Sequence, residues 1–341
     1  LANPSVSWEK KHIFNVGLDA TLWKSLSVNI DVFNESQSGI LALPYAQVLG
    51  IVGASYGNIL PLMNVGKVTN HGFEFKTRYQ GKIQDKITYY AEAGAWYAMS
   101  KVKEQGEDVK AENYLYKKGH SVWKPIVLEA ERFYTADDFD SEGKLKAGLP
   151  QPQFGHVAPG DIKYKDYNCD NVINENDAHP VGNSTVPAWN YMFSGGLKYK
   201  GFDLSFVFQG VAKRDVYLSG ASVYSFQNNG TASNLAFDSW TPSNTDASYP
   251  RLSTVDFSNN YRTSTFWRRN GSFLRLRDVQ VGYELPAAVS QAVRLSNIYF
   301  YVNATNLFTI DHLGKLGDAE QDNLLSYPLM RTVSVGLKLA F

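Results

Sequence analysis

The chain ends in the stretch RTVSVGLKLAF, residues 331–341, and this stretch decides the fold. Apolar residues alternate along it with small or polar ones, and the apolar phase holds Val333, Val335, Leu337, Leu339 and Phe341. A strict period of two is typical of a β-strand that has one apolar and one polar face. The alternation continues to the last residue, with no polar tail and no turn after it.

The same alternation recurs through the rest of the sequence. Working back from the C-terminus, it occurs at 298–304, 279–283, 202–208, 191–199, 87–97, 73–79, 28–32 and 14–22. Together with the terminal stretch this predicts nine strands, each with one apolar face. We find no long helical stripe. The sequence therefore predicts an all-β protein.

The connections between these strands alternate in length. The shorter links are 24–26, 81–85, 199–201 and 285–296. The long links are 43–64, 104–186, 217–262 and 310–327. Alternate connections of an antiparallel up-and-down sheet lie at the same end, so one end carries short turns and the other long loops. Outer-membrane β-barrels have this asymmetry, with short periplasmic turns and long extracellular loops.

Composition limits the alternatives. The 33 Lys and Arg residues balance the 33 Asp and Glu residues, and a net charge of zero argues against nucleic-acid binding. No run of about 18 apolar residues occurs, which excludes a transmembrane helix but not a barrel of alternating strands. A secreted β-sandwich or propeller would share the alternation, but it gives no reason for the asymmetric connections. The sequence therefore favours an antiparallel transmembrane β-barrel whose apolar faces contact lipid.

Residues 273–278 interrupt the pattern. Phe273, Arg275 and Arg277 fall in the apolar phase of the strand that continues at Val279. Either a β-bulge or a strand that continues above the membrane would explain this, and the sequence leaves both open.

Six segments, together with the closing strand, carry a resemblance to a known family. They are NPSVSWEKKHIFNVGLDATL (3–22), NVGKVTNHGFEFKTRY (64–79), PGDIKYKDYNCDNVINENDAHPVGN (159–183), GGLKYKGFDLSFVFQG (195–210), SFLRLRDVQVGYELP (272–286) and NIYFYVNATNLFTI (297–310). In this order they resemble the C-terminal half of the SusC/RagA family of TonB-dependent outer-membrane transporters. The resemblance spans nearly the whole chain.

The resemblance implies a plugged barrel of 22 strands, of which residues 1–341 would form about nine at the C-terminal end. We expect the plug domain to lie outside this chain. The resemblance further implies import of an oligosaccharide or peptide together with a SusD-like surface lipoprotein, driven by the TonB complex acting on the plug. The C-terminal aromatic Phe341 resembles the signal read by the outer-membrane assembly machinery.

The segment DYNCDNVINEND, residues 166–177, resembles a twelve-residue calcium loop. Oxygen ligands at alternate positions can wrap one Ca²⁺ ion, which would stabilise an extracellular loop. The candidate ligands are Asp166, Asn168, Asp170, the carbonyl of Val172, Asn174 and Asp177. Asn171 replaces the usual Gly at position six, and Asp177 replaces the usual Glu at position twelve. The alternative is a loop of Asx-turns held by its own hydrogen bonds.

The connection 104–186 is far longer than a hairpin needs, which indicates a function. It carries aromatic residues beside charged ones, and residues 228–242 are similar. Such groups suit the faces of sugars or peptides, and the candidate substrate contacts are Tyr114, Tyr116, Trp123, Tyr134 and Trp240. The alternative is that these aromatic residues pack the loops against themselves or against a partner.

Motifs of enzymes are missing from the sequence. The six His residues are scattered, and neither a His-Glu-x-x-His arrangement, a Gly-x-Ser-x-Gly elbow nor a phosphate loop occurs. Carboxylates in the polar phase, at Asp19, Asp31, Glu74 and Glu92, fit a polar lumen wall. We therefore expect a transporter and no enzyme. A secreted, calcium-stabilised glycan-binding β-sheet module is the alternative, and a passive porin is disfavoured because porins are complete without a plug.

Overall fold

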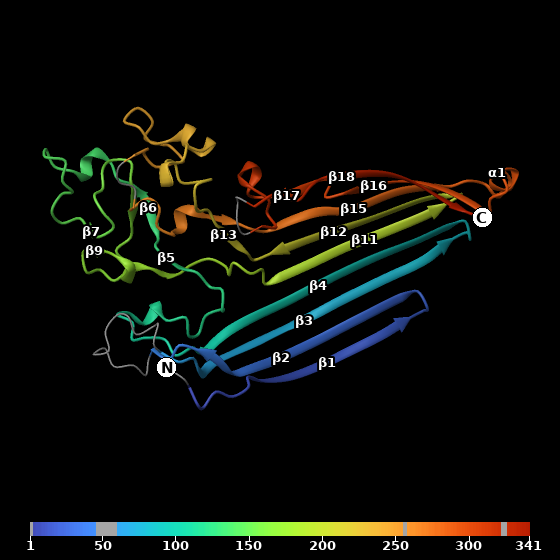
Figure 1. Ribbon diagram of the computed structural model, residues 1–341, viewed down its shortest axis with the longest axis horizontal. Coiled ribbons are helices and arrows are strands. Elements are labelled where there is room, and N and C mark those ends of the chain that lie inside the picture. Colours follow the sequence, from blue (N-terminus) through green and yellow to red (C-terminus); the bar gives the residue numbers. More distant parts are fainter. Residues whose placement is uncertain (1–2, 46–59, 255–257, 322–325) are drawn as a thin grey trace.

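A computed structural model describes residues 3–45, 60–254, 258–321 and 326–341. In these residues one antiparallel sheet dominates, and each long strand pairs with the next long strand along the chain (Figure 1). Its strands are β1 (Lys10–Leu22), β2 (Leu26–Ala42), β3 (Met63–Ile83), β4 (Ile87–Glu104), β11 (Trp189–Tyr199), β12 (Phe202–Ala212), β15 (Phe273–Glu284), β16 (Asn297–Thr305) and β18 (Thr332–Ala340). The nine predicted strands are confirmed. The short strand β17 (Thr309–Asp311) pairs with β15, while β1 and β18 form the two edges of an open sheet.

The two ends of the sheet differ as predicted. One end carries tight turns and the short helix α1 (Ala287–Ala292), and the chain finishes there (Figure 1). Lys200 and Gly201 in the β11–β12 turn both have positive φ, of 47° and 85°, as a two-residue type I′ hairpin requires. The long connections all leave the opposite end (Figure 1). Among the described residues, no helix is long and apolar enough to cross a membrane.

The sheet has one apolar and one polar face. Residues directly opposite in the register share a face, and Phe14, Leu18 and Val335 belong to the apolar one. Phe14 is 70% exposed and Val335 is 78% exposed, so nothing in the described chain covers them. A soluble sandwich would bury this face against a second sheet. The exposed apolar face therefore fits a surface that contacts lipid.

Aromatic side chains mark both ends of the apolar face. Near the loops, the rings of Phe73, Tyr97 and Trp189 lie 4.9 to 6.0 Å apart. Near the turns, Tyr79 and Tyr89 lie 5.9 Å apart. Tyr89 and Tyr97 are separated by about 27 Å of strand, which a tilt of about 40° reduces to about 21 Å. Two aromatic girdles around an apolar band are typical of outer-membrane barrels.

The β12–β15 pairing contains the bulge that the sequence left open. Val207 pairs with Asp278, whereas Phe208 pairs with Leu276, so Arg277 is the extra residue. The bulge reverses the phase of β15. Arg275 consequently lies opposite Gln209 on the polar face, and the arginines no longer interrupt the apolar face.

The main buried core lies in the loops and not on the sheet. We call residues 105–188 and 213–272 the loop lobe. Both segments contribute to one hydrophobic cluster, which includes Ile162, Tyr164, Tyr224, Tyr249 and Trp267. The lobe also contains short strands: β5 (Ile126–Val127), β6 (Ala130–Phe133), β7 (Gln151–Pro152), β8 (Ile162–Tyr164), β9 (Val172–Ile173), β10 (His179–Pro180), β13 (Asp215–Tyr217) and β14 (Arg268–Asn270).

Candidate functional site

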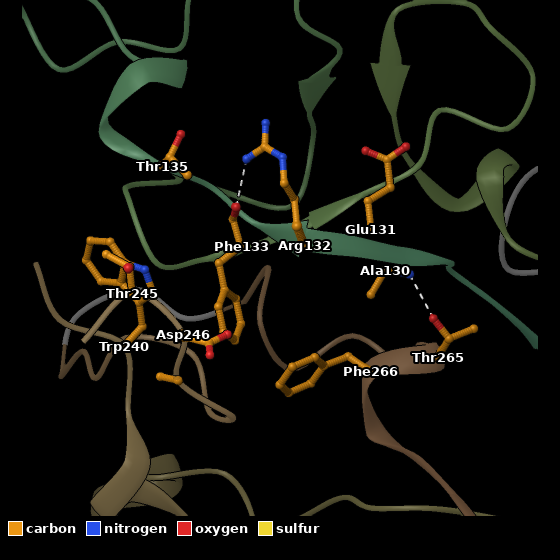
Figure 2. Close-up of a pocket in the computed structure, with 11 residues that line it drawn as sticks. Ala130, Glu131, Arg132, Phe133, Thr135, Trp240, Thr245, Asp246, Thr265 and Phe266 are labelled. Atoms are coloured by element: carbon orange, nitrogen blue, oxygen red, sulfur yellow. Dashed lines mark hydrogen bonds between the residues drawn. The ribbon is translucent and has the colours of Figure 1, made fainter.

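A cavity of about 490 Å³ opens on the loop lobe, between β6 and two segments of the 213–272 connection. We call it the aromatic cleft. Figure 2 shows the rings of Phe133, Trp240 and Phe266 and the carboxylate of Asp246 on one side of β6, while the side chains of Glu131 and Arg132 extend to its other side. These residues come from distant parts of the sequence. The shared core of the lobe brings them together.

Strand β6 supplies one wall of the aromatic cleft. It pairs with β8, and this pairing places Phe133 opposite Ile162, which belongs to the lobe core. The Ala130 N–H donates to the Thr265 hydroxyl over 2.8 Å, which ties β6 to the short 3₁₀ helix Thr265–Trp267 (Figure 2). The ring of Phe133 therefore lies 5.5 Å from that of Phe266, at 57°. This pair gives the cleft an apolar surface.

Trp240 forms a second aromatic wall, and its ring packs against Gly160. Gly160 has φ of +89°, and a Cβ atom there would lie 2.4 Å from the Trp240 ring. The indole therefore packs directly on the Gly160 backbone, which only glycine permits. The backbone N–H of Trp240 donates to the Tyr249 backbone carbonyl over 2.8 Å, and Tyr249 is part of the lobe core. Trp240 is thus fixed before any ligand arrives.

The charged residues that line the aromatic cleft are Arg132, Glu131 and Asp246. The Arg132 guanidinium donates to both Asp138 oxygens, over 2.7 and 2.8 Å. It also donates to the Phe133 carbonyl over 2.7 Å (Figure 2). The contact with Arg132 lowers the pKa of Asp138 to about 2, against the opposing effect of burial. Glu131 pairs with Lys163 at 3.2 Å, and Asp246 forms no ion pair among the described residues.

Such a cleft can bind a solute that has both flat apolar faces and hydrogen-bond donors. Fixed aromatic rings offer large contact area at low entropic cost, while carboxylates accept hydrogen bonds from hydroxyl or ammonium groups. Sugar rings and peptide side chains both meet this description.

The five aromatic residues predicted as substrate contacts do not gather at one place. Trp240 lines the aromatic cleft, and Trp123, which is 59% exposed, lines a separate cavity of about 270 Å³ near the end of β4. Tyr114 donates its hydroxyl to the Asn176 carbonyl, and burial raises its pKa to about 12. The Tyr116 hydroxyl accepts the Lys110 N–H.

Tyr134 requires a correction. It is only 1% exposed and packs against Phe139 at 5.8 Å, so it belongs to a core and cannot contact a substrate from the surface. Sequence reasoning in turn missed Phe266 and Asp246 as site residues. No spacing signal could have found them, because their position depends on the packing of one loop on another.

The predicted calcium loop has a turn of the expected kind at its start. Asp166 accepts the N–H groups of Asp170 and Asn171, over 3.2 and 2.8 Å. Asn171 has φ of 64°, the left-handed conformation that a calcium loop needs at position six. Asp177 instead accepts the Tyr167 and Asn174 N–H groups, both over 2.8 Å.

The remaining predicted ligands also hydrogen-bond within the loop. Asn168 donates to Asp170, Asp170 accepts the Val172 N–H, and Asn174 caps the 3₁₀ helix Glu175–Asp177. In the part of the chain that the structure describes, three or more His, Cys, Asp or Glu side chains nowhere converge on a metal-sized site. The hydrogen bonds follow the Asx-turn alternative, and calcium binding stays a prediction.

Known proteins match this chain along its whole length. No protein-family model matches. The chain is 25% identical to TonB-dependent receptor P26 and 23% identical to TonB-dependent receptor P3, both of Formosa agariphila. Each match covers 100% of this chain and 35% of the receptor, so the chain spans about a third of the length of these curated relatives.

Solved structures show the same fold. The RagAB peptide transporter matches with a TM-score of 0.72 and 19% identity over 100% of this chain and 36% of that one. The RagAB peptide importer in its open-open state matches with a TM-score of 0.73 and 20% identity, covering 99% and 35%. The nine-stranded sheet is therefore part of a barrel wall.

Proposed function

We propose a function from one premise: along its whole length the chain resembles the C-terminal barrel portion of a SusC/RagA-type TonB-dependent receptor in the outer membrane. The family resemblance, the barrel fold and the location that the sequence predicted are confirmed to this extent. On this basis the complete receptor imports an oligosaccharide or peptide. The present chain supplies a lipid-facing wall and a surface lobe that meets the solute.

One observation carries the proposal. A nine-stranded wall with a bare apolar face on one side, and with all long loops at one end, matches the RagAB peptide transporter over the full chain. A secreted glycan-binding module would need that face covered, because a contiguous exposed apolar surface of this extent makes a soluble protein aggregate. Import therefore fits the structure better than secretion does.

The division of the chain follows from the same proposal. Residues 1–341 form the C-terminal part of the barrel, and the predicted loops 43–64, 104–186, 217–262 and 310–327 are extracellular. Residues 46–59 of the first loop lie outside the described residues. We expect the plug to lie in the part of the complete receptor that this chain does not cover.

The partners are proposed on the likeness to RagAB. A SusD-like lipoprotein covers the loop end, the TonB complex acts through the plug, and outer-membrane lipid covers the apolar face. The matched relatives are receptors and transporters, which agrees with a non-enzymatic role. Calcium, if bound at 166–177, would be structural, because none of its candidate ligands lines the aromatic cleft.

The test compares strains with and without the complete receptor. Both are fed a mixed pool of oligosaccharides and peptides, and mass spectrometry measures what disappears from the medium. We expect the receptor to be required for depletion of one class, and an uncoupler of the inner-membrane proton gradient to abolish it. Equal depletion by both strains would refute import.

The aromatic cleft is tested in the same assay. Trp240→Ala removes a fixed wall of the cleft and should lower uptake at limiting solute by about tenfold, corresponding to ~1.4 kcal/mol of binding. Phe237→Ala is the matched control, since Phe237 is exposed in the same loop and does not line the cleft. Equal uptake by the two variants would exclude the cleft as a solute contact.

A further inference from the structure

The strands β3 and β4 continue beyond the aromatic girdle at the loop end of the sheet (Figure 1). The girdle crosses them at Phe73 and Tyr97, which pair with each other, and the strands run on to Met63 and Glu104. At about 3.3 Å per residue and a tilt of about 40°, positions two and four residues beyond the girdle stand about 5 and 10 Å above it. This is the depth at which a bilayer carries its polar headgroups.

The strand register identifies the side chains that point outward at this depth. Val32 pairs with Phe73, and Phe73 pairs with Tyr97, so these three residues share the apolar face. Because side chains alternate along a strand, steps of two towards the loops give the next outward positions of β1 to β4. They form two rows across the strands, with Phe14, Asn34, His71 and Met99 in the first row and His12, Ser36, Thr69 and Lys101 in the second. Lys10, opposite Ser38, begins a third row.

The exposed basic side chains of these rows form what we call the basic patch: Lys10, His12, His71 and Lys101. None of the four forms an ion pair with a described residue. At the same level the carboxylate of Glu35 points to the polar face, where it pairs with Lys11 at 2.6 Å. Beyond Lys101 a bulge in β4 places Glu104 opposite Lys67, which is three strands from Lys10, or about 14 Å at a strand spacing of about 4.8 Å. The outward face within the patch therefore carries basic groups without a carboxylate beside them.

The basic patch faces away from the lumen of the barrel. A plug would fill that lumen, and further strands would continue the wall beyond β1 and β18, the two edges of the sheet, so neither lies over the patch. The opposite end of the same strands provides a contrast, because its outward positions are uncharged: Leu22, Leu26, Tyr79 and Tyr89. The charge therefore distinguishes the headgroup layer at the loop end from the one at the turn end.

We propose that the basic patch binds the phosphate groups of a phosphorylated glycolipid in the outer leaflet of the outer membrane. Lysine ammonium groups form charge-assisted hydrogen bonds to phosphate oxygens, and imidazole N–H groups and the hydroxyls of Ser36 and Thr69 can donate in the same row. Phe14 lies two residues below His12 and is 70% exposed, so the acyl chains of the same lipid would meet the apolar face directly under its phosphates. The inference rests on the proposed location of the chain, with its loop end at the cell surface.

The experiment uses the complete receptor purified in detergent, with bound lipid measured by native mass spectrometry. The probes are diphosphorylated lipid A, the same lipid after removal of its phosphates, and phosphatidylcholine. We expect diphosphorylated lipid A to bind most tightly. Lys10→Gln/Lys101→Gln should weaken its binding by about tenfold or more, because each lysine near a charged headgroup layer contributes about fivefold in affinity.

Two further double variants serve as controls. Lys10→Arg/Lys101→Arg keeps both charges of the basic patch and should bind lipid A like the unmodified receptor. Lys144→Gln/Lys146→Gln makes the same change in net charge as the glutamine variant of the patch, but at exposed positions of the loop lobe, and should also leave lipid A binding unchanged.

Several results would overturn the inference. These are equal binding of lipid A with and without its phosphates, equal losses in the two glutamine double variants, or loss of binding in the arginine variant. Displacement of lipid A by inorganic phosphate would also overturn it, since the patch would then be a site for a free anion. So would dissociation of a receptor dimer in Lys10→Gln/Lys101→Gln, because the patch would then contact a second copy. Solute uptake keeps the two proposals apart: a receptor that binds lipid A and imports nothing would refute import alone, and one that imports without binding lipid A would refute only the lipid site.

Discussion

The guanidinium of Arg132 lies against Asp138, which is 7% exposed, and the same carboxylate accepts the Thr135 N–H over 2.8 Å. These bonds fix the start of the 3₁₀ helix Ala136–Asp138 and set the orientation of Arg132 at the aromatic cleft. A sequence shows an Arg and an Asp six positions apart, but it does not show that they meet. The orientation of Arg132 therefore could not be predicted from residue types alone.

Asp138 should make the loop lobe sensitive to acid. Arg132 lowers the pKa of its carboxyl from 3.8 to about 2 in the folded state, so the stabilisation is full above pH 4 and is lost as the pH falls towards 2. The contribution is about 2 kcal/mol. Asp138→Asn should remove this stability at neutral pH and flatten the dependence below pH 4. Hydrogen exchange of β6 and β8 between pH 5 and 2 measures it.

The exposed neighbour Asp137 provides the control. Asp137→Asn keeps the Arg132 contact and should retain the acid dependence of the unmodified protein. If Asp138→Asn and the unmodified protein lost protection of β6 in parallel, the Arg132–Asp138 contact would not be the cause.

The calcium prediction also depends on single residues of the 166–177 loop. If the 166–177 loop binds Ca²⁺, 1 mM calcium should raise its protection against proteolysis, and Asp170→Ala should abolish that effect. Asp170 is the informative position, because its side chain is exposed and hydrogen-bonds only to its near neighbours. Equal protection of the unmodified loop in calcium and in EDTA would leave the Asx-turns as the complete explanation.

Among the elements, alternation predicted the strands but not the loops. A strand with one exposed apolar face repeats its period along its whole length, which is 18 residues in β4 and 9 in β18, so the alternation predicts both. The pairs in the lobe, such as β5 and β10, are two residues long and have no period to detect. They form because the long connections bury a shared core, which depends on contacts that are distant in sequence.

The bulge at Arg277 anchors the last long connection, which lies between β16 and β18. Arg275 is paired with Asp318 at 2.6 Å and with Glu320 at 2.8 Å, and Arg277 reaches Glu320 at 2.5 Å. The Arg275 and Asp318 side chains are 4% and 7% exposed, so removing one partner leaves a buried charge unpaired. Such losses cost about 3–5 kcal/mol.

Arg275→Ala should therefore release the segment around Asp318 while the sheet stays folded. We expect faster hydrogen exchange and proteolysis at residues 312–321, with β16 and β18 unchanged. Arg294→Ala is the control, because Arg294 lies exposed in the short connection at the other end of β15. Unchanged exchange at 312–321 in Arg275→Ala would mean that other contacts hold this connection.

At the scale of the whole molecule, two kinds of hydrophobic surface coexist. The loop lobe buries its apolar residues around Trp267, as a soluble domain does, whereas the sheet leaves Phe14, Phe300 and Val335 exposed. Composition averages the two and gives a mean hydropathy of −0.29, which is that of an ordinary soluble protein. Only the two-residue period of each strand distinguishes the exposed apolar face of the sheet from the buried core of the lobe. For this reason the membrane-facing wall was predictable and the buried lobe core was not.

The contrast between the two faces of one strand provides a direct test of this arrangement. Phe206 and Ser205 are neighbours on β12 and pair with Val279 and Gln280, so they lie on opposite faces of the sheet. In the complete receptor reconstituted with brominated lipids, the extra fluorescence of Phe206→Trp should be quenched, as should that of Phe14→Trp and Phe300→Trp. The fluorescence of Ser205→Trp should not, because its ring faces the lumen. Equal quenching of Phe206→Trp and Ser205→Trp would mean that the apolar face does not lie against acyl chains, and with it the barrel-wall argument for import would fail.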